Sequence, residues 1–152
     1  MMSTKRKVSL LIFLMLLVFV VLAKVDYAIH GYKGYYPPMD VVMYYWFWQW
    51  MVGIPLISLA FAAAFWAGAP RTKLNRNITI GIFLTSVFLA IGQLEDFLYF
   101  TLNLVPFPSG EWTWFSGMWF YNLFGTWTTP IHFLWLAFWT LLTFTMWILT
   151  LK

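Results

Sequence analysis

The sequence predicts an all-α integral membrane protein in which four transmembrane helices form one bundle. The first observation is composition, because 62% of the 152 residues are hydrophobic and only 9% are charged, whereas an average soluble domain is roughly one quarter charged. The second is the length of the uncharged stretches, since a hydrocarbon core of about 30 Å needs roughly 20 apolar helical residues. The third is that no segment between them could hold a soluble domain, so residues 1–152 are expected to form a single membrane domain.

The four spans are expected at about residues 8–30, 41–68, 77–102 and 129–151. The first begins after a short basic cluster, and this amino terminus also fits a secretory signal with Ala23 at its cleavage site. The last uncharged run, from Trp112 to Leu151, is too long for one span. It contains Thr129 followed by Pro130, and proline is favoured at the first position of a helix. We therefore start the fourth span there.

The orientation follows from the basic residues, because cytoplasmic loops are enriched in Lys and Arg. One side of the expected bundle carries Lys5, Arg6, Lys7, Arg71, Lys73, Arg76 and Lys152, whereas the other carries Lys24 and Lys33. Both termini are therefore expected in the cytoplasm. The acidic residues all fall on the outer side, namely Asp26, Asp40, Glu95, Asp96 and Glu111. The net charge of +4 then reflects topology, and no nucleic-acid partner is expected.

Aromatic residues also crowd the outer side, although membrane proteins usually carry aromatic belts at both interfaces. They lie in two stretches, Tyr32–Trp50 and Trp112–Trp127. The stretch 109–124 is expected to form a short interfacial helix, with Ser109 as its cap and Glu111 in its first turn. Because this helix would be apolar nearly all round, it must pack either within its own fold, around a lipid-filled pocket, or against another protein.

Two adjacent acids, Glu95 and Asp96, lie in the third expected span. A rise of 1.5 Å per residue from Asn77 places Glu95 roughly 27 Å along this helix, near the outer edge of the hydrocarbon. At that depth both carboxylates could simply remain solvated. Neighbouring helical positions point about 100° apart, however, so we expect one acid to face water and the other to face a neighbouring helix.

The possible partners of the inward acid define a candidate site. Asp26 and His30 share one helix face, and His132 lies in the first turn of the fourth span, where the helix dipole favours a neutral imidazole. The candidate catalytic residues are Glu95, Asp96 and His132, and the candidate ligands of a divalent metal are Asp26, His30, Glu95, Asp96 and His132. The alternative is that each histidine is a hydrogen-bonded anchor. Haem is disfavoured because this zone is crowded with Trp and Tyr.

Two hypotheses for function remain, because no charge is expected at mid-membrane and an ion-coupled pump normally needs one. The first is a non-catalytic accessory subunit of a larger membrane complex of respiratory or oxidase type, in contact with lipids and other membrane subunits. The second is a small membrane enzyme or metal-binding protein with an outer-leaflet pocket for a lipid or isoprenoid. The small size and the outer aromatic surface favour the first hypothesis, so the sequence leans against an enzyme.

Overall fold

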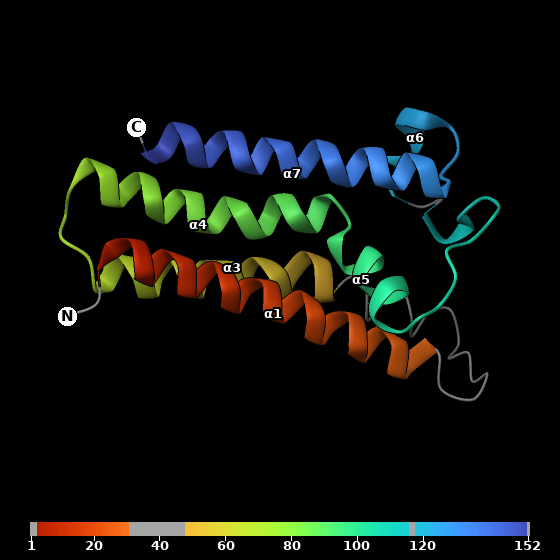
Figure 1. The fold of residues 1–152 in the computed structure, drawn as a ribbon, viewed down its shortest axis with the longest axis horizontal. Coiled ribbons are helices and arrows are strands. Elements are labelled where there is room, and N and C mark those ends of the chain that lie inside the picture. The colour runs from red at the N-terminus through yellow and green to blue at the C-terminus, as the bar shows by residue number, and fades with distance from the viewer. Residues whose placement is uncertain (1–2, 31–47, 116–117, 152) are drawn as a thin grey trace.

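The structure is a computed structural model that describes residues 3–30, 48–115 and 118–151 (Figure 1). Every regular element in these residues is helical, which confirms the all-α prediction. The elements in chain order are α1 (Thr4–His30), the π-helical segment η1 (Trp48–Gly53), α3 (Ile54–Ala67), α4 (Lys73–Ile91), α5 (Leu94–Leu102), the 3-10 turn η2 (Thr113–Phe115), α6 (Tyr121–Phe124) and α7 (Thr129–Leu151).

Three helices of the described chain are long and apolar enough to cross a bilayer, namely Thr4–Ile29 within α1, α4 and α7. The second expected span stays a prediction. It was expected at 41–68, where the described residues form η1 and the 14-residue helix α3, and residues 31–47 lie outside the described part. The fourth helix begins at Thr129, as the position of Pro130 predicts.

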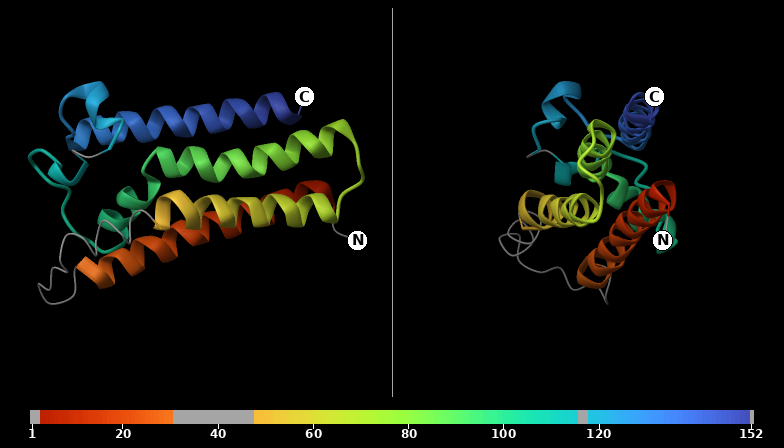
Figure 2. Two further views of the ribbon diagram at one scale, coloured as in Figure 1. Left: turned by 180° about the vertical axis from the view of Figure 1, so that it is seen from behind. Right: turned by 90° about the vertical axis from the view of Figure 1, so that its left-hand side faces the viewer.

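Helix α4 lies at the centre of the bundle (Figures 1 and 2). It packs against α3 on one side and α7 on the other, while α1 packs against α5 and also touches α3 and α4. Within the spanning windows, 44% of the α4 residues are buried but only 11% of those in α7. Among the helices, α7 therefore packs mainly against α4, while its first turns also contact aromatic residues between α5 and α7.

The buried face of α1 is a stripe of residues three, four or seven positions apart: Val8, Met15, Phe19, Ala23 and Asp26. This spacing keeps the side chains on one side of a helix. Val8 and Met15 belong to a core cluster that also contains residues of α3 and α4. Phe19 belongs to a second cluster with Ile54 and Leu89. Asp26 occupies the next position of the same stripe, so the pattern that buries apolar residues also buries a carboxyl group.

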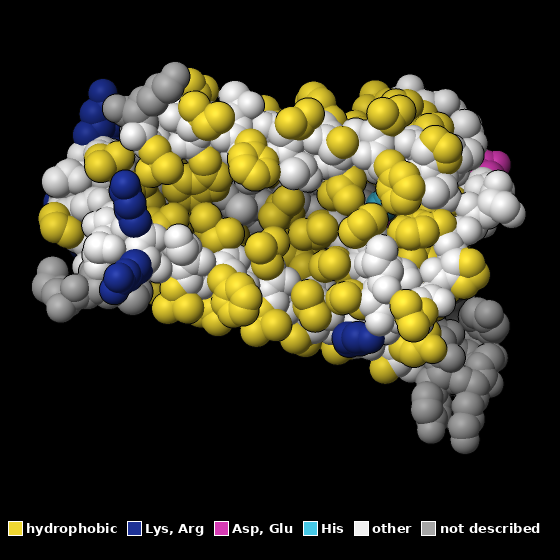
Figure 3. All heavy atoms as spheres, viewed as in Figure 1, with side chains coloured by type: hydrophobic (Ala, Val, Ile, Leu, Met, Phe, Trp, Pro, Cys, Tyr) yellow, Lys and Arg dark blue, Asp and Glu magenta, His cyan; other side chains and the backbone are white. Residues whose placement is uncertain are grey.

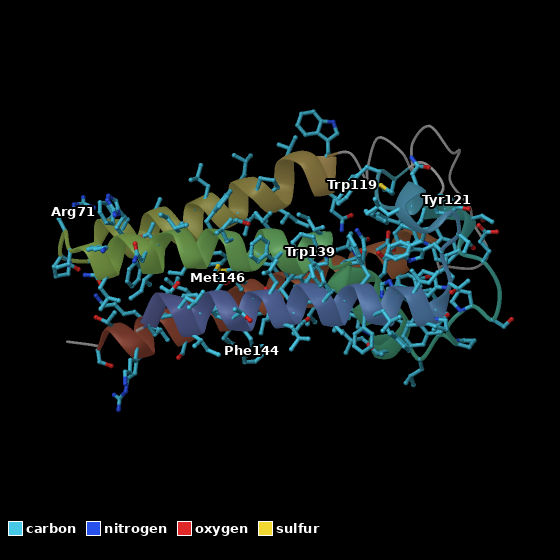
Figure 4. All side chains as sticks on the ribbon, turned by 90° about the horizontal axis from the view of Figure 1, so that it is seen from above. Arg71, Trp119, Tyr121, Trp139, Phe144 and Met146 are labelled. Carbon is cyan, nitrogen blue, oxygen red and sulfur yellow. The ribbon has the colours of Figure 1, made fainter. Side chains whose placement is uncertain are left out.

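The contact between α4 and α7 is made by tryptophans that lie on one face of α7. The Nε1 atom of Trp147 donates to Oγ1 of Thr85 at 2.8 Å, and Nε1 of Trp135 donates to the carbonyl oxygen of Ile91 at 2.7 Å. Trp139 points from α7 towards α4 between these two positions, whereas Phe144 points away from the bundle (Figure 4). Buried indoles normally need a hydrogen-bond acceptor, and α4 supplies two of them.

The third span was expected to be one helix over 77–102, and this prediction was wrong. Helix α4 ends at Ile91, and α5 begins at Leu94 after Gln93, whose φ of 60° lies in the left-handed region. The physical reason lies in the contact with α7. A Cβ at Gly92 would lie 2.9 Å from Cβ of Trp139, so only glycine allows this close approach. The break frees the carbonyl of Ile91, which accepts the hydrogen bond from Trp135.

We predict that Gly92→Ala destabilises the fold, because the new methyl group would force α4 and α7 apart. Overpacking of this kind typically costs about 1–3 kcal/mol, which thermal unfolding in detergent will report as a lower Tm. Gly81→Ala is the matched control, since its Cβ would meet Trp147 at 3.4 Å or more, within ordinary contact. Equal Tm values for the Gly92→Ala variant and the parent would contradict the close approach.

Candidate functional site

Helix α5 lies along the last turns of α1 and is fastened to them at its carboxyl end. The Nζ atom of Lys24 donates to the carbonyl oxygen of Leu102 at 2.9 Å and to Oδ1 of Asn103 at 2.8 Å. The rings of Tyr27 and Tyr99 are 5.9 Å apart. These contacts satisfy a free carbonyl at the end of α5 and fix the direction that the chain takes after the break at Gln93.

This direction brings three carboxyl groups together between α1 and α5. Glu95 is 4% exposed and Asp26 is 9% exposed. The carboxyl groups of Asp26, Glu95 and Asp96 interact electrostatically with one another, and Asp96 also interacts with the indole of Trp114. The Oε1 atom of Glu95 makes no hydrogen bond to any described residue. We call Asp26, Glu95 and Asp96 the acidic cluster, which has the chemistry to hold a proton or a cationic group.

His132 is fully buried in the first turn of α7, on an aromatic wall. Its ring stacks on Trp112 with the centroids 4.6 Å apart and meets Trp127 edge-on at 6.5 Å. Neither imidazole nitrogen has a hydrogen-bond partner within the described chain. Trp112 is itself held in place, because its backbone N–H donates to Trp127 at 2.7 Å and its Nε1 donates to Thr129 at 3.2 Å.

The candidate ligands therefore fall into separate places. Asp26, Glu95 and Asp96 lie together, His132 lies among aromatic rings, and the side chain of His30 is outside the described part. Within residues 3–30, 48–115 and 118–151, no three His, Asp or Glu side chains are grouped to hold a metal ion. The metal site expected from the sequence thus has no support in this part of the chain.

The segment between α5 and α7, together with Phe100 of α5, forms an aromatic cluster at one end of the bundle. We call this group the aromatic cap, and its buried members are Phe100, Trp112, Phe115, Phe120 and Trp127. Figure 4 shows Trp119 and Tyr121 at this end and Arg71 at the opposite end. Part of the aromatic surplus of the 103–128 region is thus packed within its own fold, whereas Trp119 and Phe124 are 59% and 46% exposed.

The prediction of a single helix over 109–124 was wrong. Residues 109–112 are not helical, and regular structure among the described residues of this stretch is limited to η2 and the four-residue helix α6. The reason is that the backbone N–H of Trp112 bonds to the carbonyl of Trp127, far along the chain, instead of to a helical neighbour. Inward packing of the aromatic side chains outweighs the helical periodicity that the sequence suggests.

A surface hydrogen bond ties the start of the cap to α6. The hydroxyl of Tyr121 donates to Oε1 of Glu111. This bond, together with the negative charge of Glu111, raises the pKa of Tyr121 above its usual value, because both favour the protonated phenol. The bond is therefore intact below the ordinary tyrosine pKa and is lost as the pH rises through the raised value.

Three residues of this end were not singled out as site residues by the sequence. Gln93 and Leu104 both have left-handed backbones, with φ of 60° and 55°. Gln49 in η1 is 7% exposed, and neither its Oε1 nor its Nε2 has a partner in the described chain. Glycine is the usual signal for a left-handed position. Positions 93 and 104 carry glutamine and leucine, so sequence patterns could not have revealed their left-handed backbones.

The described residues define a helical protein with membrane-spanning candidates, a buried acidic cluster and an aromatic cap. No protein-family model, curated protein or solved structure matches the chain. The roles assigned below rest on the contacts, burial and charge of the residues themselves.

We predict that Glu95→Gln raises the Tm. The variant keeps the shape of the side chain but cannot ionise, and burial together with the carboxyl groups of Asp96 and Asp26 disfavours the charged form of Glu95, so the gain in Tm should be absent in acid and should grow as the pH is raised. Glu111→Gln is the control at an exposed carboxylate, where the amide oxygen can still accept the hydrogen bond from Tyr121, so the change should stay within about 0.5 kcal/mol. A lower Tm for Glu95→Gln would show instead that the Glu95 carboxylate has a stabilising cationic partner.

Proposed function

We propose that the protein is a non-catalytic accessory subunit of a larger membrane complex, of respiratory or oxidase type, and that it docks through the loop after α5. The observation that supports this proposal is the exposure and the backbone conformation of Leu104. Its side chain is 91% exposed, and its backbone φ is 55°. One residue thus combines an exposed apolar side chain with an unfavourable backbone conformation.

Leu104 follows the last turn of α5 at a position where helices commonly end in a left-handed residue. The N–H of Val105 bonds to the carbonyl of Phe100 at 3.0 Å, which is the hydrogen bond of a Schellman motif. Glycine is the usual residue there, and an L-residue costs about 1–2 kcal/mol. No packing gain within the described fold offsets this cost, because the side chain points outwards. Outliers of this kind mark functional contacts, so we assign the side chain to a partner subunit.

The separation of the reactive groups supports a non-catalytic role. A general acid–base pair must lie within hydrogen-bonding distance of its substrate or of each other. His132 instead stacks on Trp112, and neither of its nitrogens bonds to a carboxylate among the described residues. Glu95 belongs instead to the acidic cluster between α1 and α5.

The packing of α7 supports neighbours within the membrane plane. Among the helices this one packs mainly against α4, and it carries many exposed apolar side chains along its length. The large exposed side chains on α7 are Phe133, Leu134, Phe138, Leu141, Leu142, Phe144, Ile148, Leu149 and Leu151. Lipid chains and apolar helices of other subunits both suit such a face, and Leu104 adds a contact point at the cap end.

We predict that Leu104→Gly has opposite effects on the isolated protein and on the complex. Removing the left-handed strain should stabilise the isolated protein by about 1 kcal/mol, measured as a higher Tm. Removing the exposed side chain should weaken the association, measured as loss of co-purifying subunits after extraction in mild detergent. Hot-spot contacts are worth about 2 kcal/mol or more. Most of the partner subunit should therefore dissociate from the Leu104→Gly variant when the purified complex is washed at low protein concentration.

Two controls make this result specific. Leu123→Ala removes another exposed leucine at the same end, from a helical backbone in α6, and should change neither the Tm nor the co-purifying set. Leu104→Asn tolerates the left-handed conformation and should behave like the glycine variant. A parent protein that leaves mild detergent as a clean monomer would contradict the proposal, as would an unchanged partner set in Leu104→Gly.

A second candidate function, a lipid- or isoprenoid-binding membrane enzyme, is favoured by the buried polar atoms without partners. Oε1 of Glu95 and both amide atoms of Gln49 are buried without a hydrogen bond to the described chain, and such groups normally have partners. A ligand carrying a polar group could supply them. The acidic cluster would then act on that ligand, and Glu95→Gln would lose a co-purifying lipid that the Leu104→Gly variant keeps.

A further inference from the structure

The described charges are divided between the two ends of the bundle. Asp26, Glu95, Asp96 and Glu111 lie at the end that carries the aromatic cap. The opposite end carries Lys5, Arg6, Lys7, Arg71, Lys73 and Arg76, and we call it the basic end. Figure 3 shows most of the dark blue side chains gathered at one end of the molecule and a magenta side chain at the other. Among the described basic residues, Lys24 is the exception to this division.

The cations of the basic end come from separate segments that the fold brings side by side. Val8 of α1 and Ile78 of α4 belong to the same core cluster. Lys7 reaches across to the turn after α3, where its Nζ donates to the carbonyl oxygen of Gly68 at 3.3 Å. The first turns of α1 and α4 therefore both lie near this turn, and their basic residues belong to the same end of the molecule.

The turn between α3 and α4 is held in one conformation by its own hydrogen bonds. Arg71 donates to the carbonyl of Trp66 at 2.9 Å, and its guanidinium lies 4.1 Å from the centre of that indole ring. Nδ2 of Asn75 donates to the carbonyl of Pro70 at 2.8 Å, and the backbone N–H of Asn75 donates to Oγ1 of Thr72 at 3.2 Å. The position of the charge on Arg71 is thus set before any ligand arrives.

Four other cationic side chains of the basic end have no partner among the described residues. The side chains of Lys5, Arg6, Lys73 and Arg76 are exposed and form no hydrogen bond or ion pair with any described residue. Exposed cations grouped without counter-charge attract anions strongly, because nothing on the protein neutralises them. Helices α1 and α4 also both begin here, so the positive ends of two helix dipoles add to the same field.

Exposed apolar side chains follow these cations on the same helices, and they favour an anion that also has an apolar part. Leu10 and Phe13 of α1 are 47% and 61% exposed, and Leu74 and Ile80 of α4 are 49% and 51% exposed. The ring of Trp66 lies 4.1 Å from the guanidinium of Arg71, and tryptophans are common at the headgroup level of a bilayer. A soluble anion would use only the cations, whereas an amphiphile would use both zones.

From this arrangement we propose that the basic end binds the headgroup phosphate of an anionic phospholipid. The phosphate lies against the exposed cations of α1 and α4, and the acyl chains lie along the apolar side chains that follow them on the same helices. Clusters of four to eight Lys or Arg beside a membrane span bind anionic lipids in this way. The site is independent of the docking function proposed for Leu104, which lies at the other end of the chain fold.

The test uses the full-length protein purified in a mild non-ionic detergent. Phosphatidylglycerol, phosphatidylcholine or inorganic phosphate is added at equal phosphate concentration, and lipid retention is measured by native mass spectrometry, with the Tm as a second readout. Phosphatidylglycerol should be retained and should raise the Tm more than the other two. Each cation near the headgroup contributes about 1 kcal/mol, so the double variant K73Q/R76Q should bind phosphatidylglycerol roughly 30-fold more weakly.

The matched control is K73R/R76K, which keeps both charges and should retain the lipid. An unchanged Tm of K73Q/R76Q in phosphatidylcholine shows that the variant is folded, so that its weaker binding reports the headgroup contact. Equal retention of phosphatidylglycerol and phosphatidylcholine would overturn the proposal. So would an undiminished affinity of K73Q/R76Q for phosphatidylglycerol, or an equal Tm gain with inorganic phosphate, since the last result would indicate an anion site without lipid specificity.

Discussion

The close approach of α4 and α7 at Gly92 is the constraint on which the rest of the described structure depends. Trp139 occupies the space that a side chain at residue 92 would fill, and α4 ends there. The carbonyl of Ile91, which continuation of the helix would have paired, accepts the indole hydrogen of Trp135. An unpaired buried carbonyl would cost about 1–3 kcal/mol, so this single bond makes the end of α4 compatible with a buried position.

The redirected chain accounts for the arrangement of the cap end. Because α5 turns on to α1, Glu95 joins Asp26 and Asp96 between the two helices, and Lys24 reaches the end of α5. The next segment then begins with Leu104 in a left-handed conformation and continues into the aromatic cap. The proposed docking point and the acidic cluster are thus consequences of one helix break, whereas the basic end depends on the separate contact between Lys7 and Gly68.

Much of this fold could be predicted from local patterns. Pro130 marks the first turn of α7, and the spacing of Val8, Met15 and Ala23 predicts the face of α1 that also contains Asp26. The break at Gln93 could not be predicted, because it depends on the shape of Trp139, a residue distant in sequence. The irregular segment 109–124 was missed for the same reason, since long-range aromatic packing and the bond from Trp112 to Trp127 decide its conformation.

The direct test of the central claim is the distance between α1 and α5 when the Trp135 bond is removed. The sequence contains no cysteine, so Val25→Cys and Leu102→Cys give a unique pair of spin labels at exposed positions. In Trp135→Phe we predict a broadened distance distribution. Trp147→Phe is the control, because it removes the other indole hydrogen bond to α4, the one to Thr85 away from the break, and it should keep the narrow parental distribution. An unchanged distribution in Trp135→Phe would contradict the account.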